Sequence, residues 1–452
     1  MKRLLAHPTL AAFRDIVANA SSLVGTTAVT ALLGFVYWWV AARFFTPGEV
    51  GFAAASISAM QLLGAVGTVG CGTLLIGEFA RRRAGALILT STILAATGGL
   101  GLLLGGVFAV LAPRLAGDLR PLASNPANIG LFAVGTALTT AALILDQAVL
   151  GLGRGSFQFW RNAIFAATKL AILVPTARLL STDHEIGIYA TWVVGIAVSL
   201  VWLGARAIRL GLRPRDLLPR PTLLRDLGRA AVEHHFLNMA LQAPSLALPM
   251  VVTATLSSAQ NAYFYTAWML AGFVFVPPVA LAISLYAAAT SPESLARKLR
   301  FTLSAATAIG IAANVVIFAG ASLILLPFGA AYADAAAWPL RIIALGVFGL
   351  IVKDHYVALC RINSRLTGAI PLIIVGSLAE LALAAVGATR GGLTGLAIGW
   401  LLAISAQAVL MVPSLYRTAR GEHSAHSAQG APALRQIPPH GHLPWWAQSH
   451  AE

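Results

Sequence analysis

Two apolar runs joined by a tight turn read GFVYWWVAARFFTPGEVGFAAASISAMQLLGAVGTVGCGTLLI over residues 34–76. The first run ends in AARFF, the turn reads TPGEVG, and the second run is rich in small residues and contains GTVG. About 20 apolar residues in an α-helix cross roughly 30 Å of hydrocarbon. Because the turn is short, the two helices must be antiparallel. The stretch therefore predicts a pair of antiparallel membrane-spanning helices.

The same alternation of apolar runs and short loops continues to residue 416. Of the 452 residues, 58% are hydrophobic and only 10% are charged, whereas a soluble domain carries roughly 25% charged residues. That deficit is too large for an ordinary water-facing surface. The pattern predicts an all-α polytopic membrane protein with about 12 transmembrane helices. The expected spans are residues 19–44, 48–76, 85–111, 127–150, 155–180, 186–208, 231–256, 259–289, 301–326, 338–360, 367–388 and 391–416.

The positive charges predict the orientation of these spans. With the N-terminus inside, 22 of the 31 Lys and Arg residues fall in segments on the cytoplasmic side. Cytoplasmic loops are the ones that carry an excess of Lys and Arg, so the net charge of +15 indicates topology rather than nucleic-acid binding. We expect a multi-pass protein of the bacterial cytoplasmic (inner) membrane with both termini in the cytoplasm. The outer segments hold five basic residues, Arg43, Arg114, Arg120, Arg178 and Arg390.

The chain divides into two halves at its longest inner loop, which carries seven Arg between Arg206 and Arg229. The turns before the second and eighth spans resemble each other at Thr46 and Ser257, and the fourth and tenth spans both end after an Asp. Each half has six spans, so the halves would have the same orientation, related by a pseudo-two-fold axis along the membrane normal. The expected units are an N-terminal six-helix bundle (1–205), a basic linker (206–230), a C-terminal six-helix bundle (231–416) and a disordered cytoplasmic tail (417–452).

Three motifs resemble polysaccharide flippases, the O-antigen and exopolysaccharide exporters of the multidrug/oligosaccharidyl-lipid/polysaccharide superfamily. In that family the first turn is similar to LGPxEYG, and residues 261–289 resemble its eighth span. LGLGRGSFQFWRNAI at the end of the fourth span is similar to the family's LxGLGRFxxxxxxN. The matching positions are Thr46, Pro47, Glu49, Gly51, Arg154 and Asn162.

The resemblance covers residues 15–416 and depends on the order and spacing of the motifs. One departure concerns the peptidoglycan subgroup, whose members have several Arg in and near the first helix. This chain has no Arg between Arg14 and Arg43, which argues against that subgroup. The resemblance implies a flippase that carries an undecaprenyl-diphosphate-linked oligosaccharide, the repeat unit of a polysaccharide, across the membrane by alternating access with ion coupling. Expected partners are that lipid-linked oligosaccharide, membrane lipids, a polysaccharide polymerase and glycosyltransferases, without nucleic acid.

The sequence contains no recognisable catalytic constellation. It has no Walker loop with Lys, no metal-ligand spacing and no nucleophile elbow. We therefore expect a protein that is not an enzyme and that uses no cofactor and no metal. Two other classes stay open: a cation-coupled multidrug exporter of the same superfamily, and a non-transporting membrane scaffold of a polysaccharide assembly complex.

Ionisable residues within the spans are the candidate functional groups, because each costs at least about 2.5 kcal/mol at the bilayer centre and usually faces a cavity or a partner. Asp146 and Arg161 fall at similar depth on adjacent helices. They form either a structural ion pair or a site in which Arg161 holds a diphosphate and Asp146 orients it. We assign Arg161, Lys169, Arg154 and Asn162 to substrate binding.

Carboxylates in the spans are candidates for ion coupling. Lys169 and Glu380 lie near the midplane of corresponding spans, where Lys169 could attract an anionic headgroup and Glu380 could carry a coupling proton. The alternative is that they pair with each other or with other helices. Asp354 lies between Lys353 and His355, a group that could also be a local solvated cluster. We assign the ion-coupling role to Asp146, Glu380 and Asp354.

Overall fold

The computed structural model describes residues 17, 21, 31–72, 75, 79, 83–179, 184–211, 218–220, 229–288, 292–363 and 365–421. Within these residues, nine helices are long and apolar enough to cross a membrane. A shorter apolar helix, Ala31–Phe44, precedes them. The remaining elements are α2 (Pro47–Gly67), α4 (Arg83–Leu115), η2 (Gly117–Ala123), α5 (Pro126–Gly151), α6 (Gly155–Leu179), α7 (His184–Arg209), α8 (Arg229–Thr255), α9 (Ser258–Ala288), α10 (Pro292–Leu325), η5 (Leu326–Phe328), α11 (Ala330–Leu345), α12 (Val347–Ile362) and α13 (Leu366–Ala419).

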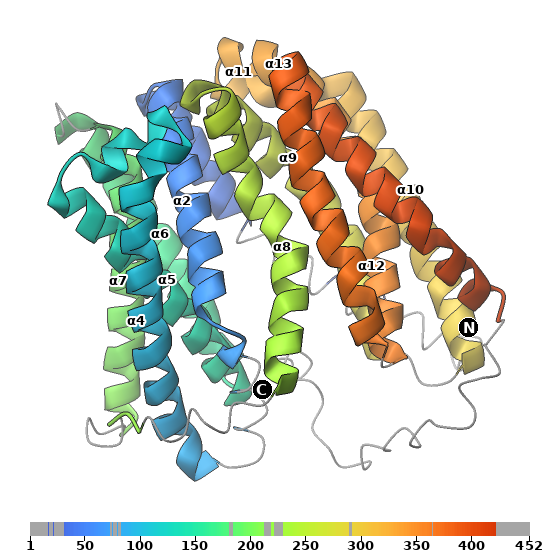
Figure 1. The fold of residues 1–452 in the computed structure, drawn as a ribbon, viewed down its shortest axis with the longest axis horizontal. Coiled ribbons are helices and arrows are strands. Elements are labelled where there is room, and N and C mark those ends of the chain that lie inside the picture. The colour runs from blue at the N-terminus through green and yellow to red at the C-terminus, as the bar shows by residue number, and fades with distance from the viewer. Residues whose placement is uncertain are drawn as a thin grey trace, which may run out of the picture.

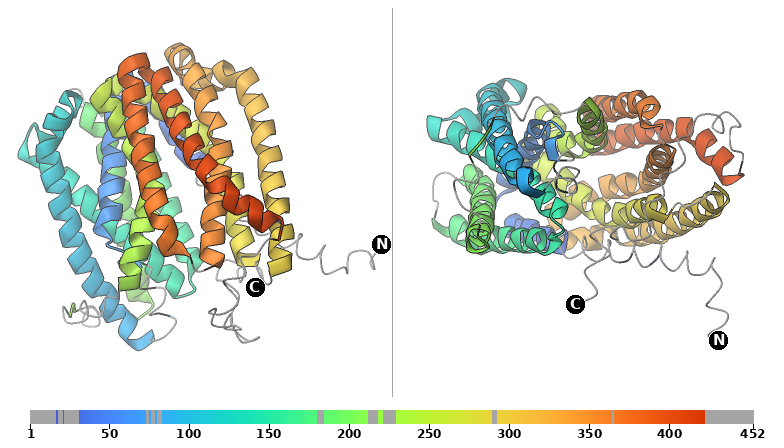
Figure 2. Two further views of the ribbon diagram at one scale, coloured as in Figure 1. Left: turned by 45° about the vertical axis from the view of Figure 1, so that its right-hand side comes forward. Right: turned by 90° about the horizontal axis from the view of Figure 1, so that it is seen from below.

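The predicted fold class is confirmed: an all-helical chain arranged as two bundles. Helices α11 and α12 together make one crossing, and α13 makes two, because Gly391 and Gly392 have non-helical dihedrals and interrupt it. Helices α2 and α4–α7 lie on one side of Figure 1 and helices α10–α13 on the other. Figure 2 shows the same division from below. The residue boundaries of the predicted units stay a prediction, and most of the predicted tail, residues 422–452, lies outside the described residues.

The TPGEVG turn begins α2 through a capping box. The backbone N–H of Thr46 donates to Glu49 Oε2 at 2.7 Å, and the N–H of Glu49 donates to Thr46 Oγ1 at 3.4 Å. Pro47 occupies the first helical position, where its missing N–H costs nothing and its fixed φ suits the helix. These residues fix the tight turn between Ala31–Phe44 and α2, which run antiparallel as predicted.

Helices α2 and α9 cross where the two halves meet. A side chain at Gly51 would collide with the backbone of Ser258 and Ala262, so only glycine permits this approach. The Nδ2 of Asn261 donates to the carbonyl of Gly51 at 2.8 Å, over a sequence separation of 210. This separation matches the offset between the turns at Thr46 and Ser257. The crossing therefore brings equivalent parts of the two halves together, as a two-fold axis requires.

Three predicted spans differ from the structure by several residues at one end. The ninth was expected to begin at residue 301, but α10 begins at Pro292. The second was expected to continue to residue 76, but α2 ends at Gly67 and the chain turns through Val69 and Gly70, both with positive φ. A β-branched residue rarely adopts such a φ, so periodicity gave no signal for the break. The tenth was expected to begin at residue 338, but its first helix begins at Ala330 and breaks at Gly346, against which the ring of Trp400 packs closely.

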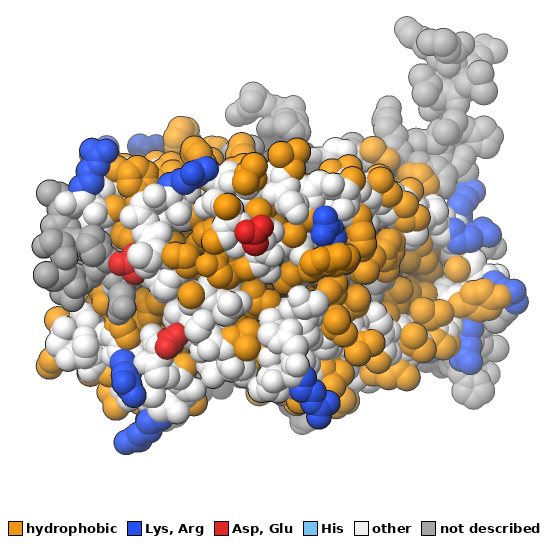
Figure 3. All heavy atoms as spheres, turned by 90° about the horizontal axis from the view of Figure 1, so that it is seen from above, with side chains coloured by type: hydrophobic (Ala, Val, Ile, Leu, Met, Phe, Trp, Pro, Cys, Tyr) orange, Lys and Arg blue, Asp and Glu red, His pale blue; other side chains and the backbone are white. Residues whose placement is uncertain are grey.

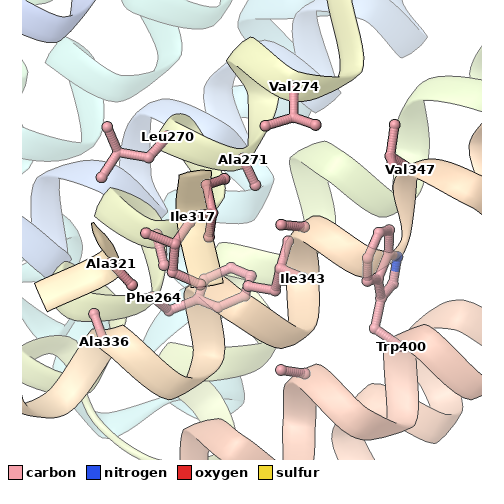
Figure 4. Close-up of a cluster of buried hydrophobic side chains, with 14 of the residues drawn as sticks. Phe264, Leu270, Ala271, Val274, Ile317, Ala321, Ala336, Ile343, Val347 and Trp400 are labelled. Carbon is pink, nitrogen blue, oxygen red and sulfur yellow. The ribbon is translucent and has the colours of Figure 1, made fainter. Parts of the chain in front are cut away.

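Each half has its own apolar core. In the second half, Phe264 and Ile317 pack with residues of α11 and with Trp400 of α13 (Figure 4). In the first half, the core around Tyr37 and Tyr189 also includes Phe328 from the second half. The cores hold the helices of each bundle together and thereby fix the positions of the buried charges described below.

Candidate functional site

Asp146 of α5 and Arg161 of α6 form a buried ion pair. The Nε of Arg161 donates to Asp146 Oδ1 at 2.7 Å and its Nη2 donates to Oδ2 at 2.5 Å. Nη2 also donates to Asn162 Oδ1 at 2.9 Å. The side chain of Arg161 is 6% exposed and that of Asp146 is 13% exposed. The two-point geometry holds the guanidinium in one orientation, so the expected juxtaposition of these residues is present.

Arg154 stands apart from this pair. It is exposed at the turn before α6, and its guanidinium lies 5.7 Å from the ring centre of Phe157. Gly153, with φ of 70°, makes the turn that places it there. Of the residues assigned to substrate binding, the structure brings Arg161 and Asn162 into contact and leaves Arg154 at the end of the helix.

Lys169 lies two turns further along α6 in a cage of aromatic rings. Its Nζ is 3.4 Å from the ring centre of Trp192, 4.5 Å from that of Tyr37 and 4.6 Å from that of Phe165. The residue is 3% exposed. A desolvated cation over an aromatic face is stabilised by about 2 kcal/mol or more. Three rings thus replace the carboxylate that a buried lysine usually needs.

The cage is assembled from three helices and reaches the other half. The hydroxyl of Tyr37 donates to the carbonyl of Ile188 in α7 at 3.0 Å. Trp38, the next residue, packs against Trp192 on one side and against Tyr265 of α9 on the other, with ring centres 6.3 Å and 4.7 Å apart. A continuous aromatic cluster therefore connects the surroundings of Lys169 to the second bundle.

Glu380 and Lys353 form the second buried ion pair, between α13 and α12. The Nζ of Lys353 donates to Glu380 Oε1 at 2.7 Å, and both side chains are less than 5% exposed. The indole Nε1 of Trp400 donates to the other oxygen of Glu380 at 2.9 Å. The suggestion that Lys169 and Glu380 pair with each other is therefore wrong, while the alternative that Glu380 pairs with another helix is correct.

The surroundings of Lys353, Asp354 and His355 also differ from a solvated cluster, and that interpretation is wrong. Lys353 is 3% exposed and His355 is fully buried. The Nδ1 of His355 lies 2.8 Å from the carbonyl of Ile351. Oδ2 of Asp354 and Nε2 of His355 are buried without a hydrogen-bond partner among the described residues. Since α12 packs against α9, α10 and α13, its polar residues are enclosed by neighbouring helices rather than by water.

The two halves carry their buried ion pairs in corresponding places. Asp146 and Arg161 join the fourth and fifth crossings, and Lys353 and Glu380 join the tenth and eleventh. The order of the charges is reversed between the halves. Removing one partner of a buried pair leaves an uncompensated charge and costs about 3–5 kcal/mol, so each pair fixes two helices relative to each other.

Several groups that complete these sites were not predicted from the sequence. Tyr37, Phe165, Trp192 and Trp400 were not among the residues predicted to form a site. A lysine in an apolar span indicates that some partner lies close to it. The sequence does not say which partner, because aromatic rings can stabilise a buried lysine as carboxylates do. Within the described residues, no group of three or more His, Cys, Asp or Glu side chains could hold a metal ion.

Several contacts between the halves lie at the end of the molecule that holds the Thr46 turn. Trp39 Nε1 donates to the carbonyl of Pro327 at 3.0 Å. The N–H of Ser258 donates to Asp118 Oδ2 in η2 at 2.6 Å. The crossing of α2 and α9 lies at the same end. Viewed from this end, the described side chains form a continuous surface with few charges (Figure 3).

No protein-family model matches the sequence, and no curated protein matches it. Solved structures do match. One described as the inward-facing conformation of a multidrug resistance MATE family transporter of the MOP superfamily has a TM-score of 0.68 at 15% identity, over 88% of this chain and 96% of that chain. The outward-facing conformation of such a transporter has a TM-score of 0.59 at 16% identity, over 90% and 96%.

A third match is a MOP superfamily transporter from Pyrococcus furiosus, described by a reverse polarity of its binding pocket that suggests a different function. Its TM-score is 0.59 at 15% identity, over 91% of this chain and 96% of that chain. At these identities the likeness establishes the fold: this chain has the 12-helix, two-bundle architecture of MATE transporters. The chain also superposes better on the inward-facing structure than on the outward-facing one.

Proposed function

We propose that this protein is a membrane transporter that works by alternating access of its two bundles. The observation that carries the proposal is the set of contacts between the bundles near the Thr46 end, namely the α2–α9 crossing and the hydrogen bonds of Trp39 and Asp118. Helix α2 also packs against α8, where His235 contacts the backbone of Val66 near the other end of α2. Two rigid bundles can rock about a central site when contacts at one end break. The higher TM-score against an inward-facing transporter supports a state closed at the Thr46 end.

The proposed cargo is an undecaprenyl-diphosphate-linked oligosaccharide. The motif resemblance of the Thr46 turn and of the turn before α6 supports this cargo. So does Arg161: among the described residues its hydrogen bonds use Nε and Nη2, and a guanidinium has further N–H donors on Nη1. Arginine suits a diphosphate because its planar donors match phosphate oxygens in pairs. In this proposal Asp146 and Asn162 orient Arg161, and Lys169 adds positive charge deeper in α6.

Coupling to an ion is proposed for the carboxylates of Asp146, Glu380 and Asp354. Each lies in a span, and the first two hold a cation from a neighbouring helix. Asp354, whose Oδ2 has no hydrogen-bond partner among the described residues, follows Lys353 in the sequence. A carboxylate that gains a proton would release its partner, and the helices it joins could then move. That exchange supplies a physical means of coupling proton uptake to rocking of the bundles.

Deletion of the gene tests the function directly. The expected result is loss of a surface polysaccharide and accumulation of its lipid-linked intermediate in the membrane. Wild-type protein should restore export, and Arg161→Ala and Lys169→Ala variants that still reach the membrane should not. A deletion strain with normal surface polysaccharide and no lipid-linked intermediate would exclude this cargo.

The second candidate is a cation-coupled multidrug exporter. It is supported by two matched solved structures that are described as multidrug resistance transporters. In this case the deletion strain should become sensitive to cationic drugs while its polysaccharide stays unchanged. A third possibility, a scaffold without transport, predicts that charge reversal at Arg161 and Lys169 leaves export intact.

A further inference from the structure

A cavity of about 470 Å³ lies between the first turns of α6 and the last turns of α7, and none of the buried ion-pair residues lines it. It is at the end of the helices opposite the Thr46 turn, which is the predicted cytoplasmic end. Its lining combines cationic, aromatic and hydroxyl side chains. The lining residues are Ser156, Phe157, Trp160, Trp202, Arg206 and Arg209.

Three guanidinium groups gather at this cavity. Arg206 and Arg209 line it. The guanidinium carbons of Arg206 and Arg154 lie 5.9 Å and 5.7 Å from the ring centre of Phe157. All three arginines are exposed, so their charge is available to a ligand. Within the part of the chain that the structure describes, neither buried ion pair involves them, and arginines of this kind bind phosphate oxygens through paired N–H donors.

An exposed apolar strip extends from the cavity toward the middle of α7, and further exposed apolar side chains lie in the first turns of α6. On α7, Val198 and Val201 are 41% and 72% exposed, and on α6, Phe159 and Trp160 are 49% and 56% exposed. Val198 and the lining residues Trp202, Arg206 and Arg209 share a helix face, because they are spaced by about one turn. Tryptophan at the end of such a strip is typical of the membrane–water interface. A ligand that occupies both the arginine-lined cavity and the apolar strip needs a phosphate and a hydrocarbon chain.

We propose that this cavity binds the phosphate of a lipid headgroup whose chain lies along the apolar strip. The shared chemistry is a phosphate attached to a hydrocarbon chain, and it comes from two sources: an anionic phospholipid or a polyprenyl diphosphate. The charge of three arginines matches either. This site is separate from the pair of Asp146 and Arg161, and it is independent of whether the protein transports oligosaccharide.

The test compares two double variants of the full chain in detergent or nanodiscs. Arg206→Gln/Arg209→Gln removes two charges from the cavity. The control, Arg417→Gln/Arg420→Gln, removes two charges from the last turns of α13, where Arg420 also lies over an aromatic ring, that of Tyr416, at 4.3 Å. Both variants change the net charge equally at the same predicted side of the membrane. The probes are phosphatidylglycerol, phosphatidylcholine, farnesyl diphosphate and inorganic pyrophosphate, and binding is measured by native mass spectrometry.

The expected result is that phosphatidylglycerol or farnesyl diphosphate binds at least about tenfold more weakly to the cavity variant than to wild type, a loss of about 1.4 kcal/mol. The control variant should bind as wild type does. Preference for phosphatidylglycerol would identify a phospholipid site, and preference for farnesyl diphosphate would identify a carrier-lipid site. Equal loss in both variants, unchanged binding in the cavity variant, or binding of pyrophosphate as tight as that of the chain-bearing probes would overturn the proposal.

Discussion

At the residue scale, the two buried ion pairs and Lys169 in its aromatic cage differ in the kind of partner that stabilises the buried charge. Glu380 receives hydrogen bonds from Lys353 and Trp400 on its two oxygens, whereas Lys169 lies against three aromatic rings. A carboxylate that loses its cation stays buried and charged. A lysine replaced by an apolar side chain of similar length leaves a cage that is still filled. Substitutions at these positions should therefore separate structural from functional roles.

Lys353→Met should lower the stability of the protein strongly. The variant leaves Glu380 as an unpaired buried charge, which costs about 3–5 kcal/mol. The measurement is the thermal unfolding midpoint in detergent, monitored with a fluorescent dye that does not react with thiols. The double variant Lys353→Met/Glu380→Gln should recover most of the loss, because both charges are then absent. A single variant as stable as wild type would contradict a structural role for the pair.

Lys169→Met should keep the fold and abolish transport. Methionine fills the space among Tyr37, Phe165 and Trp192 without the cost of burying a charge, so the thermal midpoint should stay within a few degrees of wild type. Export in the complemented deletion strain should fall at least about tenfold, equivalent to 1.4 kcal/mol. Met60→Leu, a substitution at another buried first-half position, serves as a packing control. Normal export by Lys169→Met would remove this residue from the proposed substrate site.

At the element scale, helix ends and crossings depend on small residues at defined places. The Thr46 capping box fixes where α2 begins, and glycine lets α2 approach α9. The two arms of α13 are the segments before and after the break at Gly391 and Gly392. They approach each other in the same way, because a side chain on Gly387 or Gly395 would collide with the backbone of the other residue. Contacts of this kind are typical of membrane helices, where small residues allow close packing.

Gly395→Val should disrupt the hairpin formed by the two arms of α13. The added side chain cannot be accommodated against the backbone of Gly387, and overpacking of this kind costs typically about 1–3 kcal/mol. Gly391→Ala is the matched control, since its position has open space around it and a negative φ. Yield of monodisperse protein and thermal midpoint are the measurements. Equal yields and equal thermal midpoints for the two variants would show that the close approach of Gly387 and Gly395 does not stabilise the hairpin.

At the scale of the whole molecule, the bundles meet through the packing of α2 against α8 and α9 and through hydrogen bonds at the Thr46 end. These include the hydrogen bond from the Ser258 N–H to Asp118 and the one from Trp39 to the carbonyl of Pro327. Rocking of rigid bundles would have to break such contacts in each cycle. A covalent link at the same place should therefore hold the protein in one state.

Trp39→Cys/Pro327→Cys, at two exposed positions that contact each other across the halves, bridged by a short bifunctional thiol reagent, should stop transport at the closed state of the Thr46 end. Cleavage of the bridge with a reductant, when the reagent contains a disulfide, should restore transport. Each single cysteine variant treated with the same reagent is a control, and the native Cys71 and Cys360 are both buried. Transport that continues at the wild-type rate after complete bridging would contradict alternating access of the two bundles.

The sequence by itself determined the number, order and class of the elements. Hydrocarbon forces each span to satisfy its backbone hydrogen bonds internally, so apolar runs and their short loops were enough to predict about 12 helices in two halves. The Thr46 turn could be predicted because a capping box involves only residues that are close together in the sequence. Contact between Asp146 and Arg161 was predictable as well, because they lie on consecutive helices joined by a short turn.

Only the tertiary structure decided which distant groups meet. Glu380 has Lys353 as its partner rather than Lys169, and Lys169 has rings from three helices. Arg206 and Arg209, which the sequence explained as topology signals, line a cavity with Trp202. Hydropathy and charge patterns report the depth and side of a residue in the membrane. The rotation of each helix and its neighbours are set by side-chain packing between distant segments, which no local pattern records.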